Sequence, residues 1–448
     1  MNEKIFREYD IRGIAETDLP SDIVLKLGMA IGAFVHRKGG DTLTVGRDCR
    51  KSSDRIFKAL AEGLTSVGIH VVDIGHVPTP VLYFSVFERN CDGGIMITGS
   101  HNPGDYNGLK VCVGRSTIHG TDIQEIRKLV QAGDFPLSEG SLSQYDVKPA
   151  YIKKVTSGFK TPLSVKVVVD SGNGMGGVVA PEILRKLGAE VIELYSEPDG
   201  TFPNHHPDPT VLDNLKELTA TVKREGAQLG IGFDGDADRI GVVDACGRVL
   251  FGDELLILYA RQVLAAHPGA PIISEVKASH RLFKDIEKHG GKPVMWKTGH
   301  SLIKSKMKEL KSPLAGEMSG HMFFADRYFG YDDAVYAAAR IVEIVAEARR
   351  SPAELLSDVP ESWSTAELRV DCADEKKFSV VEQAKAFFLK QGLSVNDIDG
   401  ARVEFGDGWG LVRASNTQPV LVYRFEAQSQ NRLQEIRKTV EDGVAQFL

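Results

Sequence analysis

A unit made of a strand, a helix and a second strand recurs along the chain and limits its fold more than any other feature. Each copy has an apolar, β-rich stretch, a polar or glycine-rich loop, an amphipathic helical stretch and another apolar stretch. The copies span residues 42–75, 165–195 and 271–299. Gly68, Gly188 and Gly290 stand where the helices should end, because glycine adopts the left-handed conformation needed there. This order predicts βαβ units and mainly parallel sheets.

The repeat is on the scale of a domain. The chain has 448 residues, too many for a single core, and domains hold roughly 100–200 residues. A period of that size excludes a solenoid. We therefore expect three tandem, similar α/β domains with mixed, mainly parallel sheets, followed by a smaller C-terminal α+β domain. The expected domains cover residues 1–150, 151–254, 255–365 and 366–448.

The last domain has a different pattern from the first three. Residues 367–388 and 401–427 alternate apolar and polar side chains. Such alternation is typical of antiparallel strands that are buried on one face. We expect these stretches to form half-exposed antiparallel strands with helices beside them.

The charge balance gives no reason to expect a polyanionic partner. The chain has 54 Lys and Arg against 61 Asp and Glu, a formal net charge of -7. We therefore expect no nucleic acid and no membrane among its partners. The five cysteines form no C-x-x-C pair, which indicates unpaired thiols in a reducing compartment. There is no apolar signal core at the start and no long apolar run, so we expect a cytoplasmic protein.

The first stretch that could take part in catalysis or binding follows an apolar run at 93–98. Residues 99–108, GSHNPGDYNG, are turn formers and set Ser100 at the end of the expected strand. Active sites of α/β domains gather at such ends. An ordinary turn is one interpretation. The other is a nucleophile or phosphate carrier, with Lys110 as its charge partner or proton-transfer group. The stretch lacks the G-x-S-x-G pattern of serine hydrolases.

The second stretch, DGDADR, carries three carboxylates at alternate positions, Asp234, Asp236 and Asp238. They would repel one another unless a cation lay among them, and oxygen-only ligands favour Mg²⁺. An EF-hand would need glutamate where Ala245 stands, so that interpretation fails. An acidic surface turn and a phosphatase with a nucleophilic aspartate remain alternatives. Arg239 would help to bind phosphate in either enzyme.

The third and fourth stretches point to sugar and phosphate. In 313–324, PLAGEMSGHMFF, an extended backbone would direct Glu317, Ser319 and His321 to one side. That row suits sugar hydroxyls; a metal site or an exposed turn are the alternatives. In 413–417, RASNT, a guanidinium and loop amides suit a phosphate monoester. A plain hairpin turn is the alternative there.

Several single residues could be functional, although a structural role is the usual one for each. Tyr9 and Arg12 lie in FREYDIRG near the start of the chain, and Lys277 and His300 follow two strands of the third unit. The neighbours His205 and His206 could suggest a metal, but adjacent histidines rarely chelate one ion. We interpret that pair as structural.

The four loops, in this order, resemble those of the α-D-phosphohexomutase superfamily. TGSHNPxxxNGxK is similar to its phosphoserine loop, DGDADR to its metal loop, GEMSGH to its sugar loop and RASNT to its phosphate loop. The resemblance covers nearly the whole chain and implies four domains around a central cleft. GEMSGH, YDIRG and FPNHHPDP resemble the bacterial phosphomannomutase/phosphoglucomutase group. Met318 separates this group from the phosphoglucosamine mutases.

The resemblance implies a mechanism. Ser100 would carry a phosphoryl group and pass it to a hexose monophosphate of mannose or glucose. A hexose 1,6-bisphosphate would form, turn over and return its other phosphoryl group to Ser100. The implied catalytic residues are Ser100, Lys110, His300, Arg12 and Arg239. The implied Mg²⁺ ligands are phosphorylated Ser100, Asp234, Asp236 and Asp238. The implied substrate-binding residues are Tyr9, Lys277, Glu317, Ser319, His321, Arg413, Ser415, Asn416 and Thr417.

Other functions are open at this point. The chain could be a phosphoglucosamine mutase, a Mg²⁺-dependent sugar phosphatase with Asp234 as nucleophile, or a sugar-phosphate binding protein without activity. The expected partners are small-molecule sugar phosphates that feed nucleotide-sugar synthesis, and the expected assembly is a monomer or a weak homodimer.

Overall fold

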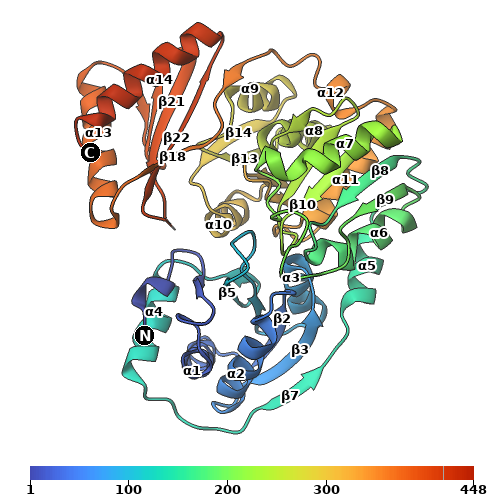
Figure 1. Ribbon diagram of the computed structural model, residues 1–448, viewed down its shortest axis with the longest axis vertical. Coiled ribbons are helices and arrows are strands. Elements are labelled where there is room, and N and C mark those ends of the chain that lie inside the picture. The colour runs from blue at the N-terminus through green and yellow to red at the C-terminus, as the bar shows by residue number, and fades with distance from the viewer. Residues whose placement is uncertain (417) are drawn as a thin grey trace.

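The computed structural model describes residues 1–416 and 418–448, and its described strands form four sheets, one after another along the chain (Figure 1). Three sheets mix parallel and antiparallel strand pairs, and the fourth is antiparallel. The expected fold class is thereby confirmed. We call the part of the chain around each sheet a body, numbered in chain order.

The first body has the strand order β1-β5-β4-β2-β3-β7, with β6 beside β5. Its strands are β1 (Ile11–Ile14), β2 (Thr42–Arg47), β3 (His70–His76), β4 (Gly93–Ile97), β5 (Tyr106–Val113), β6 (Ser116–Thr117) and β7 (Ser141–Gln144). Its helices are η1 (Glu3–Ile5), α1 (Ser21–Arg37), α2 (Ser53–Thr65), α3 (Thr79–Glu88) and α4 (Thr121–Ala132). Strands β1 and β5 run antiparallel to their neighbours, so β4 and β5 form a hairpin. This hairpin carries Ser100 in its loop and Lys110 on its second strand.

The second body has the order β12-β11-β10-β8-β9. Its strands are β8 (Lys166–Asp170), β9 (Glu190–Leu194), β10 (Leu229–Phe233), β11 (Ile240–Asp244) and β12 (Val249–Leu250). Its helices are α5 (Lys148–Thr156), η2 (Met175–Val178), α6 (Ala180–Lys186), η3 (Leu212–Leu215) and α7 (Lys216–Glu225). The antiparallel pair β10–β11 encloses the three-aspartate loop.

The third body has the order β14-β13-β15-β16. Its strands are β13 (Pro271–Glu275), β14 (Lys292–Trp296), β15 (Leu314–Gly316) and β16 (Met322–Phe324). Its helices are α8 (Gly252–Ala266), α9 (His280–Lys288), α10 (His300–Leu310), α11 (Ala334–Ala348) and α12 (Pro352–Leu355). Here too the last pair, β15–β16, is an antiparallel hairpin, so each of the first three bodies offers one hairpin loop to the site.

The fourth body has the order β17-β22-β21-β20-β19, with β18 also beside β22. Its strands are β17 (Trp363–Ser364), β18 (Leu368–Asp371), β19 (Ser394–Asn396), β20 (Ala401–Glu404), β21 (Gly408–Ala414) and β22 (Val420–Ala427). Its helices are α13 (Asp374–Lys390) and α14 (Gln430–Ala445), which cover one face of the sheet (Figure 1).

The structure corrects two expectations for this body. Residues 374–390 form helix α13, because Val380, Val381, Ala384 and Phe388 recur at helical spacing and pack into the core. Strands β21 and β22 are buried along their whole length, whereas we expected them to be half exposed. Their second face is covered because Trp409 and Leu411 pack against Val276 of the third body.

The three repeated units are β2–α2–β3, β8–α6–β9 and β13–α9–β14, as the sequence predicts. Gly188 and Gly290 directly follow the helix caps, with φ of +97° and +76°. Gly68 lies one residue further beyond α2, with φ of +91°. Two of the expected domain limits, 150 and 254, fall inside α5 and α8, and β17 pairs with β22 before the third limit. We therefore propose limits just before these three elements.

The apolar cores show how the bodies are joined. A continuous apolar cluster joins α3 of the first body to the second and third bodies, through side chains such as Phe84, Val167 and Tyr336. The fourth body has a separate core around Phe388 and Phe425. Its apolar contact with the third body is the small cluster of Trp409, Leu411 and Val276. Among the described helices, none is long and apolar enough to cross a membrane.

Candidate active site

Ser100 occupies a tight loop between β4 and β5. Its backbone φ is +49°, and its amide donates a hydrogen bond to the hydroxyl of Thr98 at 2.8 Å. Only 2% of Ser100 is exposed. Its hydroxyl donates to a carboxylate oxygen of Asp234 at 2.9 Å, across 134 residues of sequence. The loop is thus ordered, and it directs the hydroxyl at the second body.

Arg50 holds this loop from behind. Its guanidinium is fully buried and donates to the carbonyl oxygens of Ser100, Asn102, Pro103 and Tyr106 at 2.5–3.0 Å. The fifth donor, Nε, reaches Asp48 at 3.2 Å. All five donors of the side chain are used. Gly99 makes this approach feasible, because a Cβ at that position would overlap the guanidinium.

The three aspartates of DGDADR lie together in the loop between β10 and β11. Asp234, Asp236 and Asp238 are at most 1% exposed, and one oxygen from each lies within 4.8 Å of the others. Lys110 donates to Asp236 at 2.7 Å and also to Asp238. Among the described residues, Oδ1 of Asp236 has no hydrogen-bond partner, and Oδ1 of Asp238 faces only His321 at 3.2 Å. A buried oxygen without a partner and an all-carboxylate donor set fit a hard cation such as Mg²⁺.

The charges in this cluster perturb one another. Burial and the charges of Asp238 and Asp236 raise the pKa of Asp234 well above its usual value. Burial acts against ionisation of Asp238, but Lys110 and His321 outweigh it and hold its pKa well below the usual range. Lys110 is buried as well, yet Asp236 and Asp238 raise its pKa, so it stays charged. The cluster is therefore short of positive charge at Asp234, beside the Ser100 hydroxyl.

The sugar-loop residues lie on a turn, which corrects the expected extended row. Residues 317–321 close the β15–β16 hairpin, so Glu317, Ser319 and His321 converge instead of standing in line. His321 Nδ1 is 3.1 Å from both the Ser319 hydroxyl and a Glu317 oxygen. Its Nε2 is 3.2 Å from Oδ1 of Asp238. Asp238 and the hydrogen bonds to both carboxylates outweigh burial and raise the pKa of His321 to about 9.

The segment 298–300 of the third body contacts the first and fourth bodies beside Glu317. The Gly299 amide donates to Glu317 at 2.7 Å, and the Thr298 amide donates to Asp399 of the fourth body at 2.9 Å. The Tyr9 hydroxyl donates to the Thr298 carbonyl at 2.9 Å. Gly299 has φ of +130°, and a Cβ there would meet the Tyr9 ring at 2.5 Å. Tyr9 therefore reaches the third body only because this position is glycine.

His300 begins helix α10 and stacks near His321, with 5.7 Å between ring centroids. Burial, helped by the charge of Lys304, holds its pKa well below the usual value, so the ring is neutral. Arg239 has its Nε 3.4 Å from His321 Nε2. Arg12 donates to Asn102 of the Ser100 loop at 3.1 Å and also to Asp10.

The fourth body brings RASNT to the same junction. Arg413 is 5% exposed and pairs with Asp399 at 3.0 Å. Asn416 donates from its amide to the Tyr9 hydroxyl at 2.8 Å. Ser415 accepts from the Gln418 amide at 3.2 Å. Thr417, the remaining residue expected in this loop, lies outside the described residues.

Lys277 is held at the edge of the third body by Glu367 at 3.0 Å and Glu275 at 3.8 Å. The sequence analysis does not select three further residues of the site, Arg50, His101 and Asp332. Arg50 supports the Ser100 loop. His101 lies 3.1 Å from the Ser100 hydroxyl, and Asp332 lies 3.6 Å from His300. Only contacts between distant parts of the sequence identify such residues, and composition and motif spacing do not reveal those contacts.

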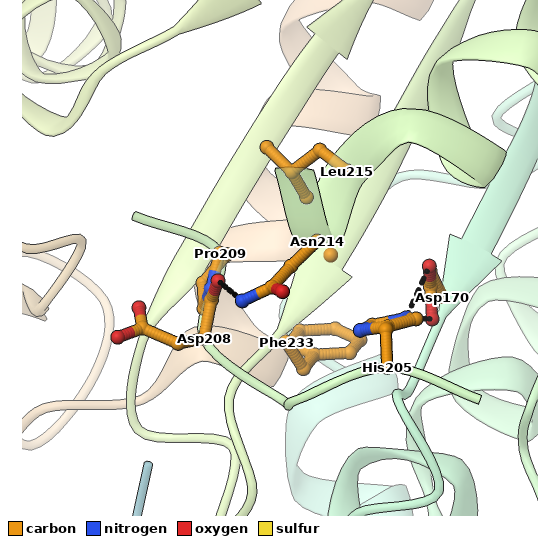
Figure 2. A pocket seen from close by; sticks show the side chains of 8 residues that line it. Asp170, His205, Asp208, Pro209, Asn214, Leu215 and Phe233 are labelled. Atoms are coloured by element: carbon orange, nitrogen blue, oxygen red, sulfur yellow. Dashed lines mark hydrogen bonds and ion pairs between the residues drawn. The ribbon is translucent and has the colours of Figure 1, made fainter. Parts of the chain in front are cut away.

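Each histidine of the pair 205–206 contacts another part of the protein. Figure 2 shows His205 beside Asp170, and its Nε2 lies 3.0 Å from Asp170. His206 contacts the carbonyl of His101, next to Ser100. His206 thus links the second body to the Ser100 loop, and His205 is anchored on the last residue of β8.

Comparisons with known proteins agree with this geometry. Four sequence models match in order: phosphoglucomutase/phosphomannomutase α/β/α domains I, II and III at residues 3–137, 149–247 and 251–363, and the C-terminal domain at 367–443. The chain therefore belongs to the phosphoglucomutase/phosphomannomutase family, within the α-D-phosphohexomutase superfamily.

Individual relatives match over nearly their whole length. Phosphomannomutase/phosphoglucomutase of Pseudomonas aeruginosa is 46% identical over 433 residues, covering 97% of this chain and 94% of the relative. Phosphoglucomutase of Neisseria gonorrhoeae is 44% identical over 438 residues, covering 97% and 95%. A crystal structure of a phosphoglucomutase/phosphomannomutase family protein from Burkholderia thailandensis has a TM-score of 0.94 and 42% identity, covering 99% of this chain and 97% of that one.

Proposed function

We propose that this chain is a phosphohexomutase that interconverts hexose 1-phosphate and hexose 6-phosphate of mannose or glucose, with Ser100 as phosphoryl carrier. One observation carries the proposal. The Ser100 hydroxyl of the first body donates to Asp234 of the three-aspartate cluster, from the second body, at 2.9 Å. A hydroxyl held against a cation site is placed for phosphoryl transfer and has no purpose in mere binding.

The residues of the chain take the following roles. When bound to the three aspartates and to the phosphoryl group on Ser100, Mg²⁺ would neutralise charge on the group being transferred. In the first half, the bond from phosphorus to Ser100 breaks, a bond to the oxygen of the sugar hydroxyl forms, and the freed Ser100 oxygen takes up a proton. We assign the proton of that hydroxyl to His300, which is neutral and sits at a helix N-terminus. Lys110 stays charged between two aspartates and acts as the charge partner.

The second half reverses these steps at the other end of the sugar. The hexose 1,6-bisphosphate turns over, and the bond from its second phosphorus to the sugar oxygen breaks as a bond to Ser100 forms. The Ser100 hydroxyl loses its proton in this step, and the freed sugar oxygen gains one. Arg239 and Arg12 steady the phosphoserine loop. Glu317, Ser319, His321 and Lys277 hold sugar hydroxyls. Arg413 with the loop amides holds the phosphate that does not react, together with Ser415, Asn416, Thr417 and Tyr9.

We further propose that the enzyme works in the cytoplasm as a monomer or weak homodimer on soluble sugar phosphates. Two observations support this. All five cysteines are unpaired, as in a reducing compartment. Few large apolar side chains are exposed on the described surface, among them Leu137, Val211 and Phe378, which favours a monomer or a weak dimer.

A ³¹P NMR time course tests the proposal. Mannose 1-phosphate, glucose 1-phosphate and glucosamine 1-phosphate are supplied in separate tubes with Mg²⁺ and a trace of glucose 1,6-bisphosphate. We expect a 6-phosphate signal to grow without inorganic phosphate in the mannose and glucose tubes. Conversion in the glucosamine tube alone would make the chain a phosphoglucosamine mutase.

Ser100→Ala is the matched control. A mutase with Ser100 as carrier loses activity in this variant and still binds glucose 6-phosphate. Release of inorganic phosphate by both proteins would move the nucleophile to Asp234 and replace the proposal with a phosphatase. Binding without turnover by the unmodified enzyme would leave only a binding protein.

A further inference from the structure

Asp236 uses its two carboxylate oxygens in different ways. Oδ2 accepts a hydrogen bond from the Lys110 ammonium at 2.7 Å and another from the Thr79 hydroxyl at 2.5 Å. These two donors occupy both lone pairs of that oxygen. In the part of the chain that the structure describes, Oδ1 has no hydrogen-bond partner, and Asp236 is fully buried. Oδ1 is therefore the oxygen that this side chain can offer to a cation.

Thr79 contacts Asp236 a second time, through the backbone. It is the first residue of α3, and its amide donates to the Asp236 carbonyl at 2.9 Å. The first amides of a helix have no acceptor within the helix, so Asp236 supplies one from the second body. The two hydrogen bonds together fix both the backbone and the carboxylate of Asp236 relative to the first body.

The Thr79 hydroxyl is not used to cap its own helix. Pro78 is the N-cap residue of α3, and no side chain makes a capping hydrogen bond there. Thr79 is fully buried, and its hydroxyl donates to a residue 157 positions further along the chain. Because a β-branched side chain has few rotamers, the backbone at the start of α3 sets where this hydroxyl points.

Helix α3 is a firm support for Thr79. Every residue from Thr79 to Val86 is buried, and Val81 and Phe84 belong to the apolar cluster that joins the first three bodies. The N-terminus of a helix also carries a partial positive charge, which favours a carboxylate beside it. Strand β4 follows α3 directly and leads to Ser100, so Thr79 and Ser100 stand on consecutive elements of one body.

We propose that Thr79 is a positioning residue of the phosphoryl-transfer site. Its hydroxyl holds Oδ2 of Asp236 so that Oδ1 is presented to Mg²⁺, and it keeps the three-aspartate loop in register with Ser100. The inference rests on the proposed function, which places Mg²⁺ among the three aspartates. Without the hydroxyl, Lys110 alone holds Oδ2, the carboxylate can turn, and the cation meets a less fixed ligand.

Metal binding tests this role apart from activity. Thr79→Val keeps the shape of the side chain and removes the donor, whereas Thr79→Ser keeps the donor. The full chain of each variant is titrated with Mn²⁺, followed by the electron paramagnetic resonance of the free ion, and then with Mg²⁺ in competition. We expect Thr79→Val to weaken binding of both ions at least about tenfold, as loss of a hydrogen bond to a ligating carboxylate does. Thr79→Ser should restore most of that affinity.

Thr44→Val is the matched control. Thr44 is also a fully buried threonine of the first body, and its hydroxyl accepts from Ser85 of α3 at 2.8 Å. The same atoms are lost beside the same helix, but from strand β2 and without removing a donor to an aspartate. We expect Thr44→Val to bind Mn²⁺ as the unmodified chain does. Equal weakening in both valine variants would overturn the proposal. If Thr79→Val fails to fold, as judged by circular dichroism, Thr79→Ala takes its place.

Kinetics give a second readout that a purely structural role would not move. Thr79→Val should need at least about tenfold more Mg²⁺ for its half-maximal rate, while KM for glucose 1-phosphate stays unchanged. Excess Mg²⁺ should then recover most of kcat. A kcat lowered by the same factor at every Mg²⁺ concentration would make Thr79 structural only.

Failure of this inference can be told apart from failure of the proposed function. Unchanged Mn²⁺ binding by Thr79→Val, when the unmodified chain is an active mutase, would refute the role of Thr79 alone. Weakened binding by Thr79→Val, when the unmodified chain has no mutase activity, would refute the proposed function and leave the positioning of Asp236 standing. No Mn²⁺ binding by the unmodified chain would contradict both.

Discussion

The side chain that we expect to matter most outside the reacting groups is Arg50. Its five donors all bind oxygen, four of them on carbonyls of the loop that carries Ser100. Arg50→Lys keeps the charge but replaces a planar fork with a point donor. An ammonium at the same depth can reach only part of this ring of oxygens. The loop should therefore lose its fixed shape.

The magnitude follows from the bonds that are lost. Hydrogen bonds to a charged group contribute about 1.5–3 kcal/mol each. If lysine keeps three of the five bonds, the loss of two costs at least about 3 kcal/mol. For a unit the size of the first body this lowers the melting temperature by about 6–12 °C. A shift of the Ser100 hydroxyl by about 1 Å would slow phosphoryl transfer roughly 100-fold.

Two measurements check this prediction. Calorimetry gives the melting temperature, and intact-mass spectrometry follows phosphorylation of Ser100 by glucose 1,6-bisphosphate. Arg55→Lys is the control, because Arg55 also donates to two carbonyls of the first body but does not touch the Ser100 loop. Arg50→Lys with unchanged melting and unchanged phosphorylation would refute the reasoning. Reduced melting with a normal phosphorylation rate would make Arg50 structural only.

The other predictions concern the remaining parts of the site. Arg413→Ala should raise KM at least about tenfold, since a phosphate loses a bidentate partner, yet leave Ser100 open to phosphorylation; steady-state kinetics with normal KM would contradict the clamp. Tyr9→Phe removes two hydrogen bonds between bodies and should lower the free energy of unfolding by about 1–3 kcal/mol, measured by urea unfolding. An unchanged midpoint would show that these two hydrogen bonds do not stabilise the protein. For His205, Asp170 outweighs burial and raises the pKa. The His205–Asp170 ion pair thus contributes fully to folding stability below the pKa of His205 in the unfolded chain, near 6.5. That contribution is lost as the pH rises through the higher pKa of His205 in the folded protein. The stability difference from His205→Gln should be larger at pH 6 than at pH 9, and a constant difference would disprove the ion pair.

Most of the fold can be predicted from the sequence, because the patterns that indicate strands, helices and helix ends each lie within a short stretch of chain. Each βαβ unit is complete within about forty residues, and the glycines that end the helices are visible one by one. The four loops were likewise visible because each is a short motif. Helix α13 differs from the strand that we predict there. The apolar residues at its start fit both the two-residue period of a strand and the 3.6-residue period of a helix, and only the spacing from Val380 to Phe388 indicates a helix.

The sequence could not give the contacts between loops. Asp332 stands in an unremarkable GYDDAV stretch, and its place beside His300 depends on the β16 hairpin returning next to α10. Arg50 stands in a polar loop that looks like any helix start. The alternating side chains of residues 317–321 predict an extended segment, because such alternation does not distinguish a strand from a hairpin turn of so few residues. Such facts arise from packing, which reading along one chain does not reveal.

One physical property of the site decides how tightly it can hold its substrate. The groups proposed to bind sugar and phosphate already have protein partners: Arg413 pairs with Asp399, Lys277 with Glu367, and Glu317 with His321. A ligand must replace these contacts, so only the difference between the two sets of bonds appears as affinity. For each group, the free energy gained from the ligand is largely offset by the free energy lost from the protein partner. A bisphosphate held this way can release both ends and turn over, because the protein partners close again behind it and no charge is left buried alone.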